Sequence, residues 1–269
     1  MRSPALLLLL MVASLAFAQS PSIAPGGVLN AASGVVGQPV TIGSLVSIFG
    51  SNLASGMAQA DTIPLSTSLG GVSVQFVNGG TTLSAPMLFV VGSQVNVQVP
   101  WNLVPPNATQ NVNVVVNVGN VASPPAQVTI GPSSPGIFAT AAPDFRAIAQ
   151  NVDGTLAQPA GSIAGLTTHP VKVGDALIIY ATGLGPVDNP PSDGGIPPTG
   201  TLVNTLTQPI VMVGGMSAKV LFSGLQPQFV GVNQVNIVVP NVPAGDKVPL
   251  QLQMGGITSP SNVTIAVTQ

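Results

Sequence analysis

The stretch GSLVSIFGSNL at residues 43–53 organises the chain, because a glycine turn opens its apolar run and a second glycine turn ends it. The pattern returns in the second half of the chain as GDALIIYATGL at residues 174–184. A second pair of stretches agrees with the first, QVNVQVP at residues 94–100 and QVNIVVP at residues 234–240. These matches predict one β-rich unit that occurs twice, with Phe49 and Tyr180 at equivalent positions.

Apolar and polar residues alternate through most of the chain, as they do in strands with one buried face. In residues 94–100, for example, valine alternates with the amides Gln94, Asn96 and Gln98. Asn78-Gly79 predicts a hairpin turn, and Pro86 predicts an edge or bulged strand. The remaining strands are expected at residues 69–77, 83–91, 111–118, 126–130, 175–181, 209–213, 218–222, 234–239, 248–254 and 262–267.

Sustained helical periodicity is absent, and 27 prolines and 31 glycines are spread along the chain. About seven short strands in the first half, separated by turns, are typical of an immunoglobulin-like sandwich, and the second half repeats the pattern. The expected fold class is therefore all-β, with two tandem immunoglobulin-like β-sandwich domains.

Residues 1–18 have the features of a secretory signal peptide, namely Arg2, an apolar run over residues 5–13 and a small-residue ending at Ala18. The apolar run is too short for a membrane span, which needs about 20 apolar residues. We expect cleavage after Ala18 and a secreted, extracytoplasmic protein. The first domain is expected over residues 19–131 and the second over residues 132–269. Residues 26–39 predict short extended pieces and turns, and residues 186–200 predict a long exposed loop.

The chain carries few charges: 4% of its residues are charged, residues 62–143 include none, and glutamate and cysteine are absent. Removal of the signal peptide would leave four basic and seven acidic residues, a net charge of −3. No basic patch is available to neutralise phosphates, which excludes nucleic acid as a partner and disfavours anionic membrane surfaces. Without cysteine there is no disulfide, so core burial must stabilise the fold.

Residues 43–53 resemble the opening strand and turn of IPT/TIG immunoglobulin-like domains, G-x-x-V-x-I-x-G-x-N-L. Further stretches extend the resemblance: GGVLNAAS at Gly26, SLGGVSV at Ser68, QVNVQVPW at Gln94, PGIF at Pro135, NVDGT at Asn151, IIYATGLGPV at Ile178 and FVGVNQVNIVVP at Phe229. From Gly26 to Val267 the chain resembles the Solibacter-type C-terminal domain family of secreted acidobacterial proteins. That resemblance implies an exported immunoglobulin-like architecture and carries over no catalytic residue.

Catalytic candidates centre on His169, the only histidine, with Asp175 six residues away. A Ser-His-Asp triad is arithmetically possible, but no G-x-S-x-G elbow occurs and His169 lies in a Thr-Thr-His-Pro loop. One histidine without cysteine or glutamate is also too few for a usual zinc site. We therefore expect a solvated loop histidine, no catalytic residue and no enzyme activity, so that His169→Ala would leave fold and binding unchanged.

Calcium ligands are the second candidate chemistry. Asn151, Asp153 and Gly154 resemble a fragment of a calcium loop, but the acid that an EF-hand needs is missing after Gln158. A hairpin turn is the simpler interpretation of this stretch. Asp188 and Asp193, in the loop at residues 186–200, are interpreted as solvated acids, with weak calcium binding as the alternative. We predict no metal site and no cofactor.

Trp101 and Tyr180 are the only tryptophan and the only tyrosine. Large aromatic side chains contribute most when buried, so both are interpreted as core or inter-domain packing residues. The alternative is an exposed platform on which a sugar stacks. The N-x-T sequences at Asn107 and Asn262 are interpreted as chance matches.

The remaining interpretation is a secreted, non-enzymatic module that has an interaction, adhesion or structural role at the cell surface. Its expected partner is a protein or polysaccharide of the cell envelope. A carbohydrate-binding module is the alternative, and it requires Trp101 or Tyr180 to be exposed beside Asn and Gln. A hydrolase built on His169 is the third interpretation. The first domain lacks the lysines that usually guard sheet edges. We therefore also expect association through a strand edge carrying Asn113 and Asn117, either with a second copy of the chain or with a partner strand. The alternative is a monomer whose edges are capped by prolines such as Pro86 and by bulges.

Overall fold

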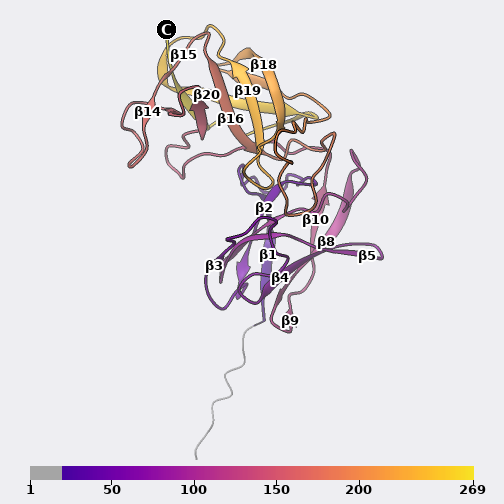
Figure 1. Cartoon of the computed structure of the whole chain (residues 1–269). Coiled ribbons are helices and arrows are strands. Elements are labelled where there is room, and N and C mark those ends of the chain that lie inside the picture. Colours follow the sequence, from indigo (N-terminus) through magenta and orange to yellow (C-terminus); the bar gives the residue numbers. More distant parts are fainter. Residues whose placement is uncertain (1–19) are drawn as a thin grey trace, which may run out of the picture.

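The computed structural model describes residues 20–269, and the predicted signal peptide lies outside this range. All the secondary-structure elements of the described part are β-strands, which confirms the all-β class. Figure 1 shows two bodies placed end to end, the first coloured from indigo to magenta and the second ending in yellow at the C-terminus. Within residues 20–269 no helix is long and apolar enough to cross a membrane.

The first domain is a sandwich of two antiparallel sheets. One sheet has the order β1-β2-β7-β6-β3, and the other has the order β10-β8-β4-β5 with β9 beside β8. This is the immunoglobulin arrangement, in which the first, second, fifth and fourth main strands oppose the third, sixth and seventh. The strands are β1 (Ser22–Asn30), β2 (Leu45–Ser51), β3 (Ala58–Gln59), β4 (Val72–Asn78), β5 (Thr81–Ser84), β6 (Met87–Val91), β7 (Gln94–Gln98), β8 (Gln110–Val118), β9 (Val121–Ala122) and β10 (Ala126–Ile130).

The second domain keeps this order but joins its two sheets into one path, β14-β13-β12-β16-β19-β18-β17-β20-β22-β15, with β11 beside β16 and β21 beside β20. The long strand β18 makes the join, because residues 216–218 pair with β17 and residues 219–225 pair with β19. The strands are β11 (Gly136–Ile137), β12 (Ala149–Asn151), β13 (Leu156–Ala157), β14 (Thr168–His169), β15 (Val171–Lys172), β16 (Ala176–Thr182), β17 (Ile210–Val213), β18 (Met216–Leu225), β19 (Asn233–Val238), β20 (Gly245–Met254), β21 (Ile257–Thr258) and β22 (Thr264–Thr268).

Strand pairing bears out the predicted equivalence of Phe49 and Tyr180. β2 pairs with β7 so that Phe49 lies opposite Gln94, and β16 pairs with β19 so that Tyr180 lies opposite Gln234. We call β2 and β16 the anchor strands. In each of them the residue before the aromatic, Ile48 or Ile179, faces inward and is fully buried. The two halves therefore place the same strand pair at the centre of each core.

Proline explains the main difference in sheet topology between the two domains. The first domain has Pro86 between β5 and β6, and these short strands belong to different sheets. Proline lacks the N–H that a sheet ladder needs, so the chain leaves one sheet at Pro86 before it enters the other. In the second domain the corresponding chain runs on as β18, with only a register shift between Val220 and Phe222. β5 lies at the edge of its sheet, and β6 has a register shift between Met87 and Phe89, so the edge or bulged strand predicted at Pro86 is confirmed.

One expectation about the first domain is wrong. Asn113 and Asn117 lie on β8, which pairs with β4 on one side and with β10 and β9 on the other, so neither residue is at a sheet edge. Their alternation with valine reflects one exposed face, which central strands also have. Residues 26–39, expected as short extended pieces and turns, contain the end of β1 up to Asn30 followed by turns, and a register shift between Ile23 and Val28 divides β1, so this expectation is confirmed.

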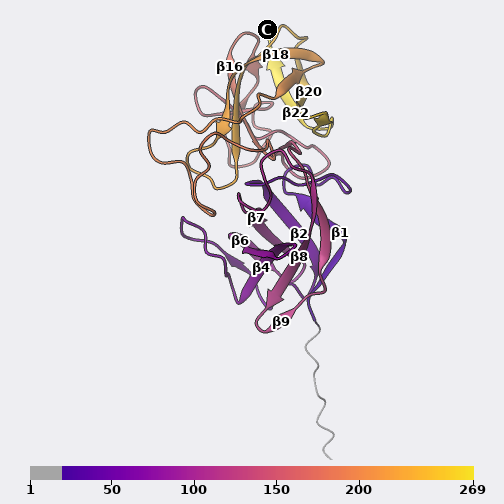
Figure 2. The ribbon, with the colours of Figure 1, turned by 90° about the vertical axis from the view of Figure 1, so that its right-hand side faces the viewer.

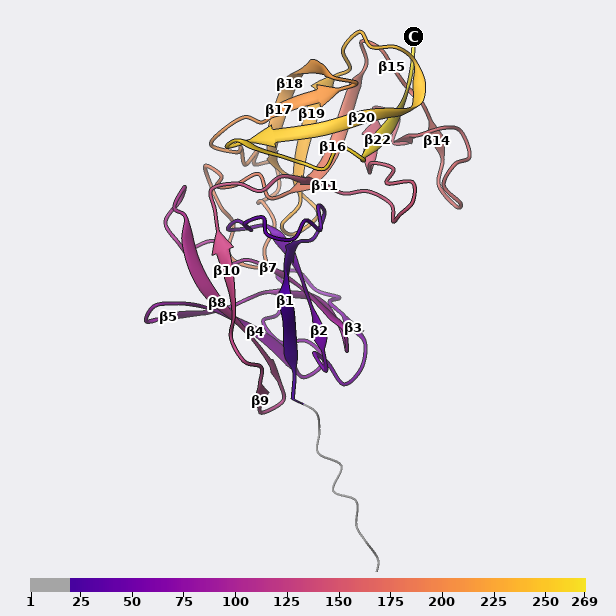
Figure 3. The same cartoon turned by 180° about the vertical axis from the view of Figure 1, so that it is seen from behind.

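The domains meet through loops that are buried between them. Residues 186–200, predicted as an exposed loop, are partly buried, and this expectation is corrected. Val187 is 6% exposed and joins the hydrophobic core of the first domain together with Val203 and Leu225. A high content of proline and glycine indicates irregular backbone but not exposure, because a neighbouring domain can bury such a segment. Figures 2 and 3 show loops of the second domain reaching the near end of the first.

Buried polar contacts hold this junction in one arrangement. Thr182 Oγ1 accepts the backbone N–H of Leu45 at 2.9 Å and donates to the carbonyl of Gly231 at 2.7 Å. Asn30 Nδ2 donates to a carbonyl of the inter-domain joint at 2.7 Å, and Gln98 Oε1 accepts a backbone N–H of the second domain at 2.7 Å. All three of these side chains are at most 2% exposed. Because buried polar groups are costly when unpaired, these contacts disfavour other relative orientations of the domains.

Candidate functional site

The connection between the fourth and fifth sandwich strands is longer in the second domain than in the first. In the first domain Gly92 and Ser93 alone join β6 to β7, whereas residues 226–232 join β18 to β19. We call this segment, QPQFVGV, the insert loop. The loop approaches the first domain, because a Cβ added to Gly231 would lie 2.7 Å from the Leu45 side chain.

The base of the insert loop is held firmly. Gly231 has a φ of 69°, which suits glycine, and it accepts the Thr182 hydroxyl described above. The buried Gln226 accepts the backbone N–H of Phe229 through Oε1 at 2.8 Å, and Val230 is buried. With both flanks held in this way, the Phe229 side chain projects outward and is 57% exposed.

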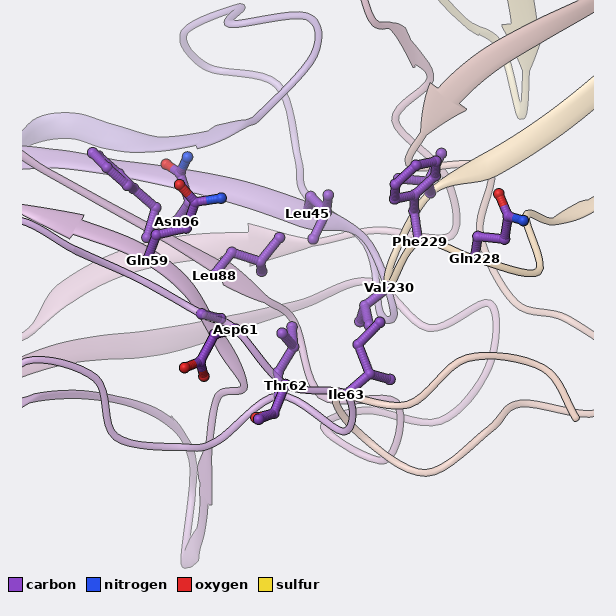
Figure 4. Close-up of a pocket in the computed structure, with 14 residues that line it drawn as sticks. Leu45, Gln59, Asp61, Thr62, Ile63, Leu88, Asn96, Gln228, Phe229 and Val230 are labelled. Carbon is purple, nitrogen blue, oxygen red and sulfur yellow. The ribbon is translucent and has the colours of Figure 1, made fainter.

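Phe229 lies between two pockets. The first has a volume of about 570 Å³ and is lined by both domains. Figure 4 shows Phe229 of the insert loop on one side and Leu45, Leu88 and Ile63 of the first domain on the other. Among the described residues that line this pocket only Asp61 is charged, and its carboxylate points away from Leu45 in Figure 4. The first pocket is thus mainly apolar.

The second pocket has a volume of about 930 Å³ and lies against the outer face of the second domain. It shares Leu45 and Phe229 with the first pocket, and it adds Gln150 of β12, Tyr180 of β16 and the exposed Leu166. None of the described residues in its lining is charged. Both volumes fall in the range of ligand pockets, about 300–1,000 Å³. We define the linings of the two pockets together as the junction surface.

Side-chain amides follow the outer faces of the central strands. Gln94 Nε2 donates to Asn96 Oδ1 at 2.8 Å, and Gln234 Nε2 donates to Asn236 Oδ1 at 3.0 Å, so the QVN repeat carries the same bond in both domains. Asn96 lines the first pocket. Each bond uses one of the four N–H donors of its amide pair. The pairs therefore keep donors and acceptors for a further partner.

The two single aromatics have different roles. Trp101 is 6% exposed, and a Cβ added to Gly43 would overlap its ring, which confirms the predicted packing role. Tyr180 departs from that expectation, because it is only partly buried and lines the second pocket. Its Oη donates to Gln150 Oε1 at 2.9 Å, and desolvation raises its pKa. Ile179 faces the core, and neighbouring residues of a strand face opposite sides, so Tyr180 lies on the outer face of β16.

His169 pairs with Asp153 and not with Asp175. Its Nε2 donates to Asp153 Oδ2 at 2.9 Å, and its Nδ1 faces the carbonyl oxygen of Pro170 at 2.9 Å. The hydrogen bond to Asp153 raises the pKa of His169, and the same bond lowers the pKa of Asp153. The other partner of the ring in the described chain is the amide of Asn151, so no hydroxyl nucleophile adjoins it. With both ring nitrogens facing acceptors, His169 is poorly suited to act as a general base.

The acids considered as calcium ligands are engaged in different places. Asp153 Oδ1 accepts a backbone N–H of its own hairpin turn at 3.0 Å, and Asp188 Oδ2 accepts Asn204 Nδ2 at 2.8 Å. Asp193 Oδ1 accepts the backbone N–H of Trp101 at 2.8 Å and so links the two domains. Within residues 20–269 no three His, Cys, Asp or Glu side chains gather as metal ligands would.

Sequence reasoning missed the insert loop and Phe229, although the spacing of the repeat carried a signal. Leu-Phe occurs at residues 88–89 and again at residues 221–222, and each copy precedes a QVN motif, at residues 94–96 and 234–236. The stretch between the two landmarks is longer in the second half, so the second half has extra residues there. An insertion at the end of a repeated hairpin is where a binding loop is expected.

No protein-family model and no curated protein matches the chain. Among solved structures it is similar to SGBP-B of the Bacteroides ovatus mixed-linkage glucan utilization locus, in complex with a mixed-linkage heptasaccharide, with 11% identity over 86% of this chain and 43% of that chain and a TM-score of 0.33. It is also similar to the plexin A4 extracellular region, with 12% identity over 96% of this chain and 19% of that chain and a TM-score of 0.27. The chain thus spans less than half the length of either protein. Similarities with TM-scores this low support no conclusion about function. The fold is assigned from the strand pairing described above.

Proposed function

We propose that the protein is a non-enzymatic binding module of the cell surface or extracellular space, and that its partner docks on the junction surface. The observation that carries this proposal is Phe229, an aromatic side chain 57% exposed on a firmly held loop between two pockets. Aromatic side chains at the centre of a recessed surface are typical hot spots of binding. An exposed ring contributes little to the fold, so its position on a rigid loop favours a role in recognition.

Catalysis has little support in the described residues. Active sites usually gather several titratable groups in one cleft, whereas the junction surface contains the single acid Asp61 and Tyr180. His169 belongs to neither pocket lining. The predicted signal peptide supplies the extracytoplasmic location in this proposal, and membership of the Solibacter-type family stays a prediction that agrees with it.

The test is retention of solubilised envelope material from the source cell on the immobilised protein, expressed without its predicted signal peptide. Phe229→Ala should reduce the affinity at least tenfold, because hot-spot truncations cost about 2 kcal/mol or more. Val121→Ala is the matched control, since Val121 is an exposed side chain on β9 at the end of the first domain remote from the junction (Figure 1). Equal retention by the two variants would contradict the proposal.

A further inference from the structure

We infer that the partner held by the junction surface is a neutral polysaccharide. This inference rests on the proposed function and names the partner class for the same surface. Three properties of the described residues lead to it, namely the scarcity of charge, the aromatic rings in the pocket linings, and the neutral hydrogen-bonding groups beside those rings.

Scarcity of charge excludes the ionic partners. Residues 20–269 contain four basic side chains, and none of them lines either pocket: Arg146, Lys172, Lys219 and Lys247. An anionic glycan or a nucleotide needs cationic groups to replace its solvation. A cationic polymer could pair with only one acidic residue of the described linings, Asp61 in the first pocket. The junction surface therefore suits an uncharged ligand.

Aromatic rings supply the apolar contact that a sugar ring needs. Phe229 belongs to both pocket linings, and Phe138 and Tyr180 belong to the second. The C–H face of a pyranose ring is apolar, so stacking it on an aromatic face removes apolar surface from water on both partners. Because the two pockets share Leu45 and Phe229, a chain of several sugar units can cross the Phe229 ring and occupy both pockets.

Neutral hydrogen-bonding groups stand beside these rings. Tyr180 Oη donates to Gln150 Oε1, and Gln150 Nε2 donates to the carbonyl of Gly154 at 2.7 Å, which holds the pair in place. The Tyr180 oxygen keeps acceptor capacity. Tyr180 also lies opposite Gln234, the first residue of the repeated amide pair. Amides and hydroxyls both donate and accept, and they therefore match the hydroxyl groups of a neutral sugar.

The position of the site on the sheets disfavours an extended peptide. Peptides commonly bind by adding a strand to an open sheet edge. β16 is paired with β12 on one side and with β19 on the other, and β7 lies between β2 and β6. Among the described strands that line the two pockets only β3 lies at a sheet edge, and with two residues it is too short to template an added strand. The faces of these central strands offer side chains, while their backbone groups are already used within the sheets. Side-chain recognition without strand addition favours the polysaccharide.

The experiment divides the solubilised envelope into a protein fraction, a neutral polysaccharide fraction and an acidic polysaccharide fraction, and measures the affinity of the protein for each. We expect binding to the neutral polysaccharide fraction, unchanged between low and high salt because no ion pair contributes. Phe229→Ala should lower this affinity more than tenfold, Tyr180→Phe should lower it several-fold, and Val121→Ala should leave it unchanged.

The outcomes separate the two proposals. Binding to the protein fraction or the acidic fraction alone, still sensitive to Phe229→Ala, would overturn the polysaccharide inference and leave the proposed function standing. Binding to no fraction would overturn both. Neutral polysaccharide binding that is indifferent to Phe229→Ala and to Tyr180→Phe would show that the sugar binds elsewhere, and would overturn the assignment of the junction surface.

Discussion

The two domains repeat one strand pair but use the connection beside it differently. β2 and β7 in the first domain match β16 and β19 in the second, down to the residues that face each other. A two-residue turn leads into β7, whereas the insert loop leads into β19 and carries Phe229 to the junction. The comparison shows that the repeated strands build the scaffold, while binding capacity is added on a loop at one of its ends. Other matched positions of the repeat test this account.

The largest expected effect concerns the glycines that open the two anchor strands. Gly43 and Gly174 have φ values of 73° and 89°, but an added Cβ overlaps the Trp101 ring in the first case and meets nothing within 4 Å in the second. Alanine at either position suffers backbone strain of about 1 kcal/mol or more. Gly43→Ala adds an overlap with the ring, so we expect a total loss of about 3 kcal/mol or more.

Urea unfolding followed by the fluorescence of Trp101 and by circular dichroism measures both variants. Gly174→Ala is the matched control, because it shares the positive φ without the clash. Equal losses of stability in the two variants would show that Trp101 does not hold the first domain against Gly43, and would break the distinction between the two anchors.

An intermediate effect is expected at the far ends of the anchor strands. Thr182→Val leaves the buried N–H of Leu45 and the carbonyl of Gly231 without their shared partner, at a cost of about 1–3 kcal/mol. Ser51 occupies the equivalent position in the first domain and is exposed, so Ser51→Ala should stay within about 0.5 kcal/mol. Thermal unfolding compares the two variants.

Hydrogen exchange of the insert loop sharpens this comparison. Loss of the Thr182 hydroxyl should speed amide exchange over residues 226–232 and weaken partner binding, while Ser51→Ala should change neither. Unchanged exchange in Thr182→Val would mean that the loop is held by other contacts, such as those of Gln226.

The smallest effect is the pH dependence of the second domain, which carries the pair of His169 and Asp153. The pKa of His169 is raised by its hydrogen bond to Asp153, so its stabilising contribution is complete below the unfolded value of about 6.5 and fades as the pH rises through the folded pKa. The pKa of Asp153 is lowered by the same bond, so its contribution is present above about 3.9 and fades as the pH falls through the folded value.

Nuclear magnetic resonance titration of the single histidine checks this prediction. We expect a midpoint above the usual value, and Asp153→Asn should return it toward that value. The first domain has no comparable pair, since residues 62–143 contain no charged side chain. An ordinary histidine midpoint in the unmodified protein would contradict the pairing.

The sequence allowed the repeated strands to be predicted because alternation and spacing are local properties. Val95 and Val97 must share a face of a strand, and the interval between Phe49 and Tyr180 can be read directly. Contacts between domains are not local. Val187 lies in a segment rich in proline and glycine, and its burial depends on a surface of the first domain that no sequence pattern indicates. Asn113 was misplaced at an edge for the same reason, since alternation shows which face is polar but does not show which strands lie alongside.

The candidate site was only partly within reach of the sequence. The sequence marks Tyr180 as a candidate because it is the only tyrosine. Carbohydrate binding requires it, or Trp101, to be exposed beside Asn and Gln. The sequence does not mark Phe229 as a candidate, because it is one of eight phenylalanines and no local pattern distinguishes it. Its place at the junction depends on the close approach of Gly231 to Leu45, a contact between residues that are far apart in the sequence.

Photo-crosslinking shows whether the partner contacts the Phe229 position itself. The photoreactive residue p-benzoylphenylalanine is placed at position 229 in one variant and at position 121 in another, and each is irradiated with the solubilised envelope. We expect a covalent adduct of the partner from position 229 and none from position 121, because the ring at position 229 belongs to both pockets of the junction surface. An adduct from position 121 alone, or equal yields from both positions, would contradict it.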